Sequence, residues 1–176
     1  MPEFDTVEVI ADIISHEMDI PTGQIALHDQ GVPAPGQTTG LYIAIDIIEK
    51  TVLSSNVRHE IRESDTDLWE VQTMRVREHI CINVISADGE ARERNHEIVF
   101  ALGGTYAQQV QEKHGLHIGR IPSAFIKVSD PAQAPGASRY TITITAQRAH
   151  YKEGAVDYYD QFQPAEILTE TENITQ

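Results

Sequence analysis

The sequence predicts an α+β fold: a small mixed or antiparallel β-sheet with helices packed on one face, extended loops and acidic terminal segments. First, apolar and polar residues alternate with a period of two in three runs, the longest from Trp69 to Ile85. Second, two long stretches repeat apolar residues at helical spacing. Third, the order strand, strand, helices, strand, strand favours a sheet covered on one face. A length of 176 residues with 40% hydrophobic content fits one domain with a real core.

The chain begins with a predicted helix over residues 5–18. Asp5 or Thr6 can act as its N-cap by accepting a hydrogen bond from a free backbone N–H group. Pro21 ends the helix, and residues 21–40 are so rich in proline and glycine that they predict an extended loop or arm. The apolar residues of the helix recur at helical spacing: Val7, Ile10, Ile14 and Met18.

Two strands are expected next. Residues 41–47 alternate apolar and polar side chains, which is typical of a half-buried strand. Residues 51–67 are polar and irregular, and predict either the limb of a ragged hairpin or an excursion from the sheet. In the long strand from Trp69 to Ile85, Glu78 interrupts the apolar face, so the strand either bulges there or projects beyond the core.

Helices follow the long strand. Residues Ala91 to Leu102 form a predicted amphipathic helix, with Arg94 and Glu97 three apart on its wet face, where they can pair. Gly103-Gly104 breaks this helix. A shorter second helix is expected to end at Gly115 in left-handed geometry.

The C-terminal part contains two short extended runs and then the clearest strand of the chain, Tyr140 to Ala146, where β-branched residues alternate. Beyond residue 151 an acidic tail carries aromatic residues that we expect to dock on their own domain or on a neighbour: Tyr158, Tyr159 and Phe162. The single domain, residues 1–176, is therefore divided into an N-terminal helix (1–20), a loop or arm (21–40), a sheet and helix core (41–151) and an acidic C-terminal segment (152–176).

The formal net charge of -14 is unevenly placed along the chain. No Lys or Arg precedes Lys50, and Lys152 is the last one, while acidic residues occur throughout both ends. Tight nucleic-acid binding needs clustered Lys and Arg to replace the counterions on phosphates, so this charge argues against it. The acidity either maintains solubility or faces nucleic acid that must slide past without sticking.

Composition also indicates the compartment. No apolar run approaches the roughly 20 residues of a membrane span, so a soluble protein without a membrane partner is expected. The first residues do not resemble a signal peptide. One cysteine, Cys81, excludes an internal disulfide framework and fits a protein made in a reducing cytoplasm.

No residue pattern predicts catalysis, a cofactor or a metal. His114 and His117 are close in sequence, but a loop glycine separates them and no carboxylate follows at a familiar ligand spacing. Cys81 shares a strand face with His79, which is a common result of alternation, and we interpret it as an inert, partly buried thiol. Arg75 and Arg77 share that face and either form interstrand or intersubunit salt bridges or stay solvated.

These elements together resemble a known family. The chain is similar to the neck or tail terminator-like proteins of long-tailed bacteriophages over roughly residues 20–170. The resemblance rests on the order and character of the elements rather than on a sharp motif. They are the turn-rich entry to the strand Leu41 to Ile45, the long strand through Arg75 to Val84, the polar Asp88-Gly89 turn, the helix Ala91 to Leu102, the short strand Leu116 to Ile121 and the strand Tyr140 to Ala146.

The resemblance implies a virion structural protein, a tail terminator that forms a ring, expected to be a hexamer. Such a ring caps the tail tube, at the tail-neck junction, after synthesis in the bacterial host cytoplasm. Its implied partners are other copies of itself, the tail tube protein and the sheath, and the head-neck connector or stopper. DNA passes through the lumen without sequence-specific binding. The family has no catalytic residues to carry over.

Two rival functions remain open at this stage. Another head-to-tail neck component, such as a stopper, collar or tail-completion protein, would share the same composition and location. A small cytosolic enzyme using His and carboxylate groups would require a pocket that holds a metal or a substrate. For subunit or tube contacts, the sequence offers five candidates: Tyr158, Tyr159, Phe162, Arg75 and Arg77.

Overall fold

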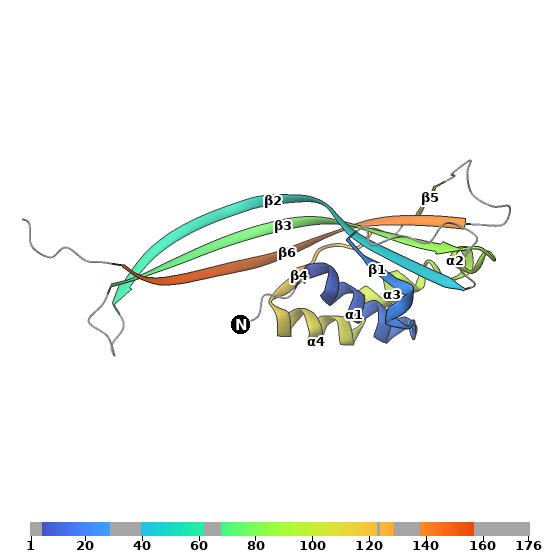
Figure 1. The fold of residues 1–176 in the computed structure, drawn as a ribbon, viewed down its shortest axis with the longest axis horizontal. Helices are drawn as coiled ribbons and strands as arrows, with labels where there is room; N and C mark the ends of the chain where they lie inside the picture. Colours follow the sequence, from blue (N-terminus) through green and yellow to red (C-terminus); the bar gives the residue numbers. More distant parts are fainter. Residues whose placement is uncertain (1–4, 29–39, 62–67, 123, 129–137, 157–176) are drawn as a thin grey trace, which may run out of the picture.

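The protein is built on a six-stranded mixed sheet, so the predicted α+β class is confirmed (Figure 1). The computed structural model describes residues 5–28, 40–61, 68–122, 124–128 and 138–156. The strand order is β1-β2-β3-β6-β4, with β5 also paired to β6. β1 runs parallel to β2, and the other pairs are antiparallel. The elements are α1 (Thr6–Met18), η1 (Thr22–Gln24), β1 (Ile25–Leu27), β2 (Leu41–Ile61), β3 (Leu68–Ser86), α2 (Glu90–Arg94), α3 (Glu97–Gly103), α4 (Thr105–His114), β4 (Leu116–Ile118), β5 (Ile126–Val128) and β6 (Ser138–Val156).

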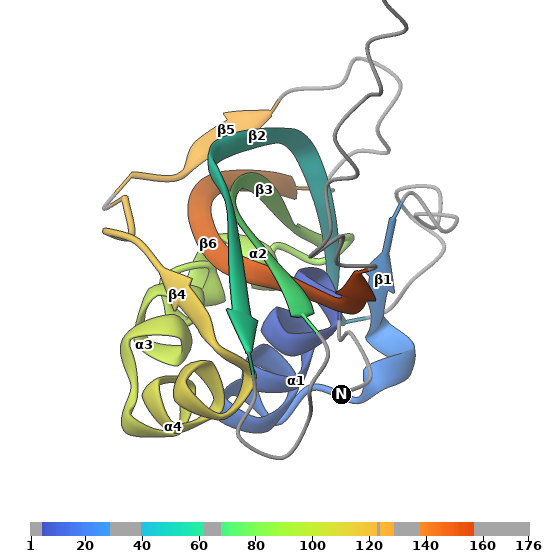
Figure 2. The same ribbon diagram turned by 90° about the vertical axis from the view of Figure 1, so that its left-hand side faces the viewer.

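The three long strands divide the molecule into two halves. In one half the helices pack on one face of the sheet, as predicted (Figure 1). In the other half β2, β3 and β6 run on together, without a helix beside them, as a twisted and curled three-stranded ribbon (Figures 1 and 2). We define the ribbon as residues 48–61, 68–79 and 147–156. The first segment pairs with the second apart from the bulge residues Ile48 and Leu53, and residues 68–77 of the second pair with the third.

The hydrophobic core lies between the helices and the first half of the sheet. Alternation along each strand turns every second side chain toward the helices, so isoleucines from β2, β3 and β6 meet those of α1. Large side chains that are completely or almost completely buried there are Ile10, Ile13, Ile14, Ile43, Ile45, Ile80, Ile82, Ile98, Leu102, Ile142 and Ile144. This half therefore supplies the packing that fixes the position of the ribbon.

The first helix agrees closely with the expectation from sequence. The Asp5 carboxylate accepts a hydrogen bond from Val7 N–H at 3.3 Å, as an N-cap. Asp19 ends the helix with a φ of 54°, in the left-handed region. The segment 21–40 was predicted as a loop or arm, but its first part contains η1 and the short strand β1. Residues 29–39 lie outside the described residues.

The prediction of a polar, irregular excursion over residues 51–67 is wrong for residues 51–61. They continue β2 as a regular strand, which is the hairpin-limb alternative, while residues 62–67 lie outside the described residues. Two register shifts, at Ile48 and Leu53, break the alternation and hide the strand in the sequence. Of the two alternatives at Glu78, the strand projects beyond the core, because β3 continues in register through Glu78 into the ribbon, and the bulges lie on the neighbouring strand β2.

The helix predicted from Ala91 to Leu102 is two shorter helices, α2 and α3, separated at Asn95 and His96. The amphipathic stripe survives the break, because Ala91, Ile98 and Leu102 are all buried. Arg94 pairs with Glu97 at 2.8 Å, as expected, and also with Glu90 at 2.8 Å. The second helix, α4, ends as predicted at Gly115, whose φ is 61°.

The last strand is longer than the sequence indicated. β6 runs from Ser138 to Val156, so the boundary placed between residues 151 and 152 falls inside a strand. The core alternation was predicted correctly, since Ile142, Ile144 and Ala146 are buried. Residues 157–176, with Tyr158, Tyr159 and Phe162, lie outside the described residues.

Candidate assembly surface

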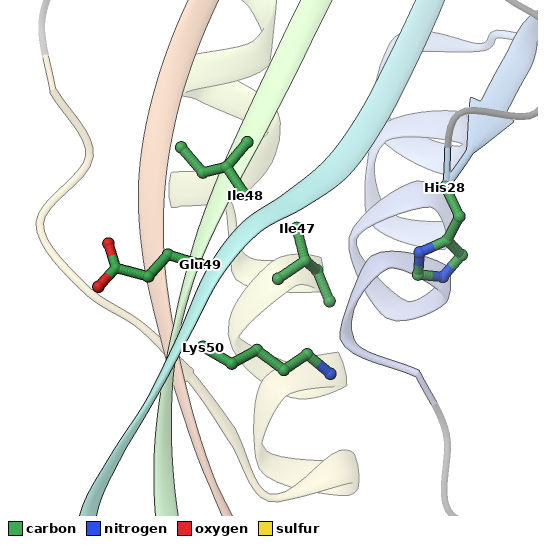
Figure 3. Close-up of a pocket in the computed structure, with 5 residues that line it drawn as sticks. All are labelled: His28, Ile47, Ile48, Glu49 and Lys50. Carbon is green, nitrogen blue, oxygen red and sulfur yellow. The ribbon is translucent and has the colours of Figure 1, made fainter.

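The ribbon carries the most unusual surface of the protein, and it begins where β1 ends. At this point an open recess of about 380 Å³ is lined by His28, Ile47, Ile48, Glu49 and Lys50 (Figure 3). Ile47 and Lys50 extend on the side of His28, whereas Glu49 extends on the other side of β2 (Figure 3). The recess therefore lies between Ile45, the last residue of β2 that pairs with β1, and the first bulge of β2, at Ile48.

A buried carboxyl group, that of Glu78, forms an ion pair at the end of the ribbon nearest the core. Glu78 is 1% exposed, and Lys50 Nζ lies 3.0 Å from its Oε1 across the β2–β3 pair. The angles at this contact do not meet hydrogen-bond geometry, so the interaction is an ion pair, and Oε2 has no hydrogen-bond donor among the described residues. Burying a carboxylate is costly unless a cation or donor compensates for it. The pair therefore explains why a glutamate can interrupt the apolar face of β3.

Beyond this ion pair, the face of the ribbon that continues the helix-covered face exposes apolar side chains. Val57 is 55% exposed and Ile61 73% exposed, although both belong to a regular strand. The exposed apolar residues on this face are Val52, Val57, Ile61, Met74 and Val156. Exposed apolar side chains along one face make it a candidate contact surface.

The opposite face of the ribbon is mixed in character. Arg75 is exposed and Arg77 half-buried, one rung apart, and neither forms an ion pair with any residue in the described ranges. The interstrand salt bridge considered for them is therefore absent within that part of the chain. Their role in subunit contacts stays a prediction. Tyr151 is also exposed on this face, while Val71 is buried.

Apart from residues 147 and 148, which pair with β4, both long edges of the ribbon lack a neighbouring strand among the described residues. β1 covers β2 only at residues 43–45, and on the other side β4 covers β6 only at residues 146–148. Beyond its second bulge, β2 offers residues 54–61 as an unbroken edge. β6 offers residues 149–156. Open edges present main-chain N–H and C=O groups to any strand that approaches, and proteins normally shorten or cover them.

The ribbon also differs from the rest of the protein in charge. It holds six of the 13 Lys and Arg residues but only five of the 27 Asp and Glu residues. Its formal charge is therefore +1, while the rest of the chain, with seven Lys and Arg and 22 Asp and Glu, carries -15. A neutral surface with exposed apolar groups favours association, whereas the acidic remainder disfavours it.

The candidate reactive groups are spread out within the described residues. Cys81 is half-buried, and burial raises the pKa of its thiol above the ordinary value, although a hydrogen bond from Asn83 acts in the opposite direction. His114 ends α4 and His117 lies exposed in β4. No three His, Cys, Asp or Glu side chains among the described residues are grouped to hold a metal ion. None of the described helices is long and apolar enough to cross a membrane.

Comparison with known proteins adds no relative. No family model matches the chain, and no curated protein matches it. The site is therefore defined by its geometry alone. Reasoning from the sequence missed the ribbon because its two bulges interrupt the strand pattern. A usable signal was present in residues 56–61, where Val57 and Ile61 alternate with Asn56, Arg58 and Glu60.

Proposed function

We propose that this protein is a virion structural protein, a tail terminator whose ring caps the tail tube and joins it to the head-neck connector. The observation that carries the proposal is the three-stranded ribbon, which extends beyond the helix-covered core with open edges and exposed apolar side chains (Figure 1). Such a ribbon is suited to reach a neighbouring subunit, because an isolated sheet with little packing gains stability when a partner covers it.

The charge distribution supports the same function. A channel that passes DNA needs walls that do not hold phosphates, and acidic side chains repel the DNA backbone. The exposed side of α1 offers such groups, with Glu8 and Asp12 both open to solvent. The nearly neutral ribbon can then form protein contacts without strong repulsion between copies.

A phage carrying a stop codon early in this gene provides the direct test. We expect its lysates to contain DNA-filled heads and separate tails, and the purified protein, added back, to restore infectious particles. Mixing the purified protein first with either isolated tails or isolated heads, before the other part is added, decides between a terminator and a neighbouring neck component. A terminator binds isolated tails first, whereas a stopper or collar protein binds isolated heads first.

If the proposal is right, heads and tails cannot join without this protein. Particles that assemble with joined heads and tails in the absence of the protein would overturn it. Enzymatic activity of the purified protein on a small substrate, together with normal particles, would favour the enzyme alternative.

A further inference from the structure

We propose that neighbouring copies join through their ribbons, with residues 54–61 of β2 in one copy pairing in parallel with residues 149–156 of β6 in the next. This inference rests on the proposed ring function and specifies the contact that builds the ring. The ribbons of successive copies would then form one continuous sheet that links the subunits of the ring. Three features of the edges favour this pairing: the direction of their main-chain groups, their equal height on the ribbon and the side chains that they carry.

The direction of the main-chain groups follows from two hydrogen bonds at the edges of the core. His28 N–H donates to Ile45 O at 3.1 Å, so the main-chain groups of Ile45 point away from β3. Gly119 N–H donates to Thr145 O at 2.7 Å on the opposite edge, so those of Thr145 also point outward. Because hydrogen-bonded pairs alternate along antiparallel strands, the register carries this direction into the ribbon.

The outward positions can thus be assigned along both edges. Ile45 lies opposite Ile82 and Thr145 opposite His79, so the groups point outward in β2 opposite even-numbered residues of β3 and in β6 opposite odd-numbered ones. On the unbroken edge of β2 these positions are Ser55, Val57, His59 and Ile61. On the edge of β6 they are Ala149, Tyr151, Glu153 and Ala155.

The two edges also lie at the same height on the ribbon. Ser54 and Ala149 both flank Arg75, and Ile61 and Val156 both flank Leu68. Each edge therefore spans eight residues between the same two levels. Within one copy β2 and β6 are both antiparallel to β3, so two ribbons placed side by side bring β2 and β6 together in parallel.

When the two edges are aligned at equal height, their outward groups match the hydrogen-bond pattern of a parallel pair. In such a pair, one residue bonds to the two residues that flank its partner. With Val57 beside Lys152 of the next copy, the outward groups of Val57 meet those of Tyr151 and Glu153. Side-chain faces agree as well, since Val57 and Lys152 both flank Gln72 on the same face. A shift by one residue would put the apolar row on the wrong face.

A second copy is the occupant that the surface chemistry favours. Equal height places exposed Ile61 against Val156 of the neighbour, which buries apolar surface on both. The ribbon is close to neutral, so copies of it meet without the repulsion that the acidic remainder would cause. Because the two edges are different surfaces, the contact is head-to-tail, which closes into a ring when the rotation between copies permits.

Cysteine crosslinking between differently tagged copies tests the contact. In a Cys81→Ser background, one chain carries Val57→Cys and the other Lys152→Cys, and the two are co-expressed. A short bismaleimide is expected to give a dimer that carries both tags. The matched control replaces Lys152→Cys with Ile126→Cys, a 69% exposed position on β5 near the same edge of the sheet, and should give no such product.

A proline substitution tests the main-chain hydrogen bonds themselves. Val57→Pro removes an outward N–H group that pairing with β3 does not use, so the fold should survive, as edge strands tolerate proline. Val57→Thr keeps both the N–H group and the β-branched shape. We expect mass photometry to show at least a tenfold loss of oligomer for Val57→Pro, little loss for Val57→Thr, and unchanged circular dichroism for both.

The outcomes separate this inference from the proposed function. Rings that persist in Val57→Pro, without a crosslink between positions 57 and 152, would overturn edge pairing and leave the ring intact. A dominant crosslink between two copies of position 57 would indicate a two-fold contact and would also overturn it. A protein that pairs through these edges but is dispensable for joining heads to tails would overturn the function alone.

Discussion

Glu78 was located from the sequence as an exception on its strand, but its partner Lys50 was not. The sequence correctly marked Glu78 as an exception on the apolar face of β3. It could not show that Lys50 lies 3.0 Å away, because the first bulge of β2 sets the register between them. A pair whose members are 28 residues apart in the chain, and whose register depends on a bulge, is a tertiary property, and local patterns do not contain it.

Removing the lysine should therefore destabilise the protein through the carboxyl group that remains. Lys50→Met is expected to lower the free energy of unfolding by about 2 kcal/mol, less than for a fully buried pair because Lys50 is half-exposed. Adding Glu78→Met should recover most of that loss, since no buried charge is left. Urea unfolding of the three proteins measures this, and a double variant weaker than Lys50→Met would contradict the account.

Two side chains that accept hydrogen bonds from the first N–H groups of α2 offer a second residue-scale comparison. Buried Ser86 Oγ accepts from Ala91 N–H at 2.8 Å, and exposed Asp88 Oδ1 accepts from Glu90 N–H at 3.1 Å. Ser86→Ala leaves a buried donor without a partner and should cost about 1–2 kcal/mol. Asp88→Ala exposes its donor to water and should cost less. Equal losses in thermal unfolding would show that burial does not decide the effect.

Cys81 gives a prediction about pH. Burial is the largest cause of its raised pKa, so the folded protein holds the thiol proton more tightly than the unfolded chain does. The folded protein should therefore react with iodoacetamide more slowly at pH 8 than the urea-unfolded chain, by mass spectrometry. By linkage, stability should decrease as the pH rises above the ordinary thiol value, and Cys81→Ser should reduce that decrease. Faster alkylation of the folded protein would contradict this assignment.

At the scale of elements, prediction succeeded where one pattern runs unbroken. α1, the first half of β2, most of β3 and the core of β6 repeat apolar residues at a constant period, and all were located. β1 has only three residues and exists because β2 lies beside it, so its own sequence carries little signal. The second half of β2 failed for a different reason, because each bulge reverses which residues face the core.

The two halves of the long strands should differ in stability. In the core half, residues 41–47, 80–86 and 138–146 are covered by helices, whereas the ribbon has few buried apolar contacts. Amide hydrogen exchange followed by mass spectrometry should show slow exchange in the core half and faster exchange over residues 54–61 and 149–156 of the isolated chain. Assembly should slow exchange at those two edges most. Uniform protection along β2 in the isolated chain would show that the ribbon needs no partner.

At the scale of the whole molecule, charge and shape divide in the same place. Among the described residues, the helix-covered half carries 11 Asp and Glu against six Lys and Arg and is closely packed, while the ribbon is nearly neutral and open at both edges. The sequence revealed the acidic ends directly. It could not reveal the ribbon as a surface, because the three strands that form it are separated in the chain and meet only in the fold. The aromatic residues Tyr158, Tyr159 and Phe162 remain predicted contacts.

The ring is the central claim, and the purified protein can test it directly. Negative-stain electron microscopy, with mass photometry of the same sample, measures both the shape and the number of subunits. We predict closed rings of one fixed subunit number with a central hole. A uniform monomer at every concentration, both alone and with tail tubes from the same phage, would contradict the account.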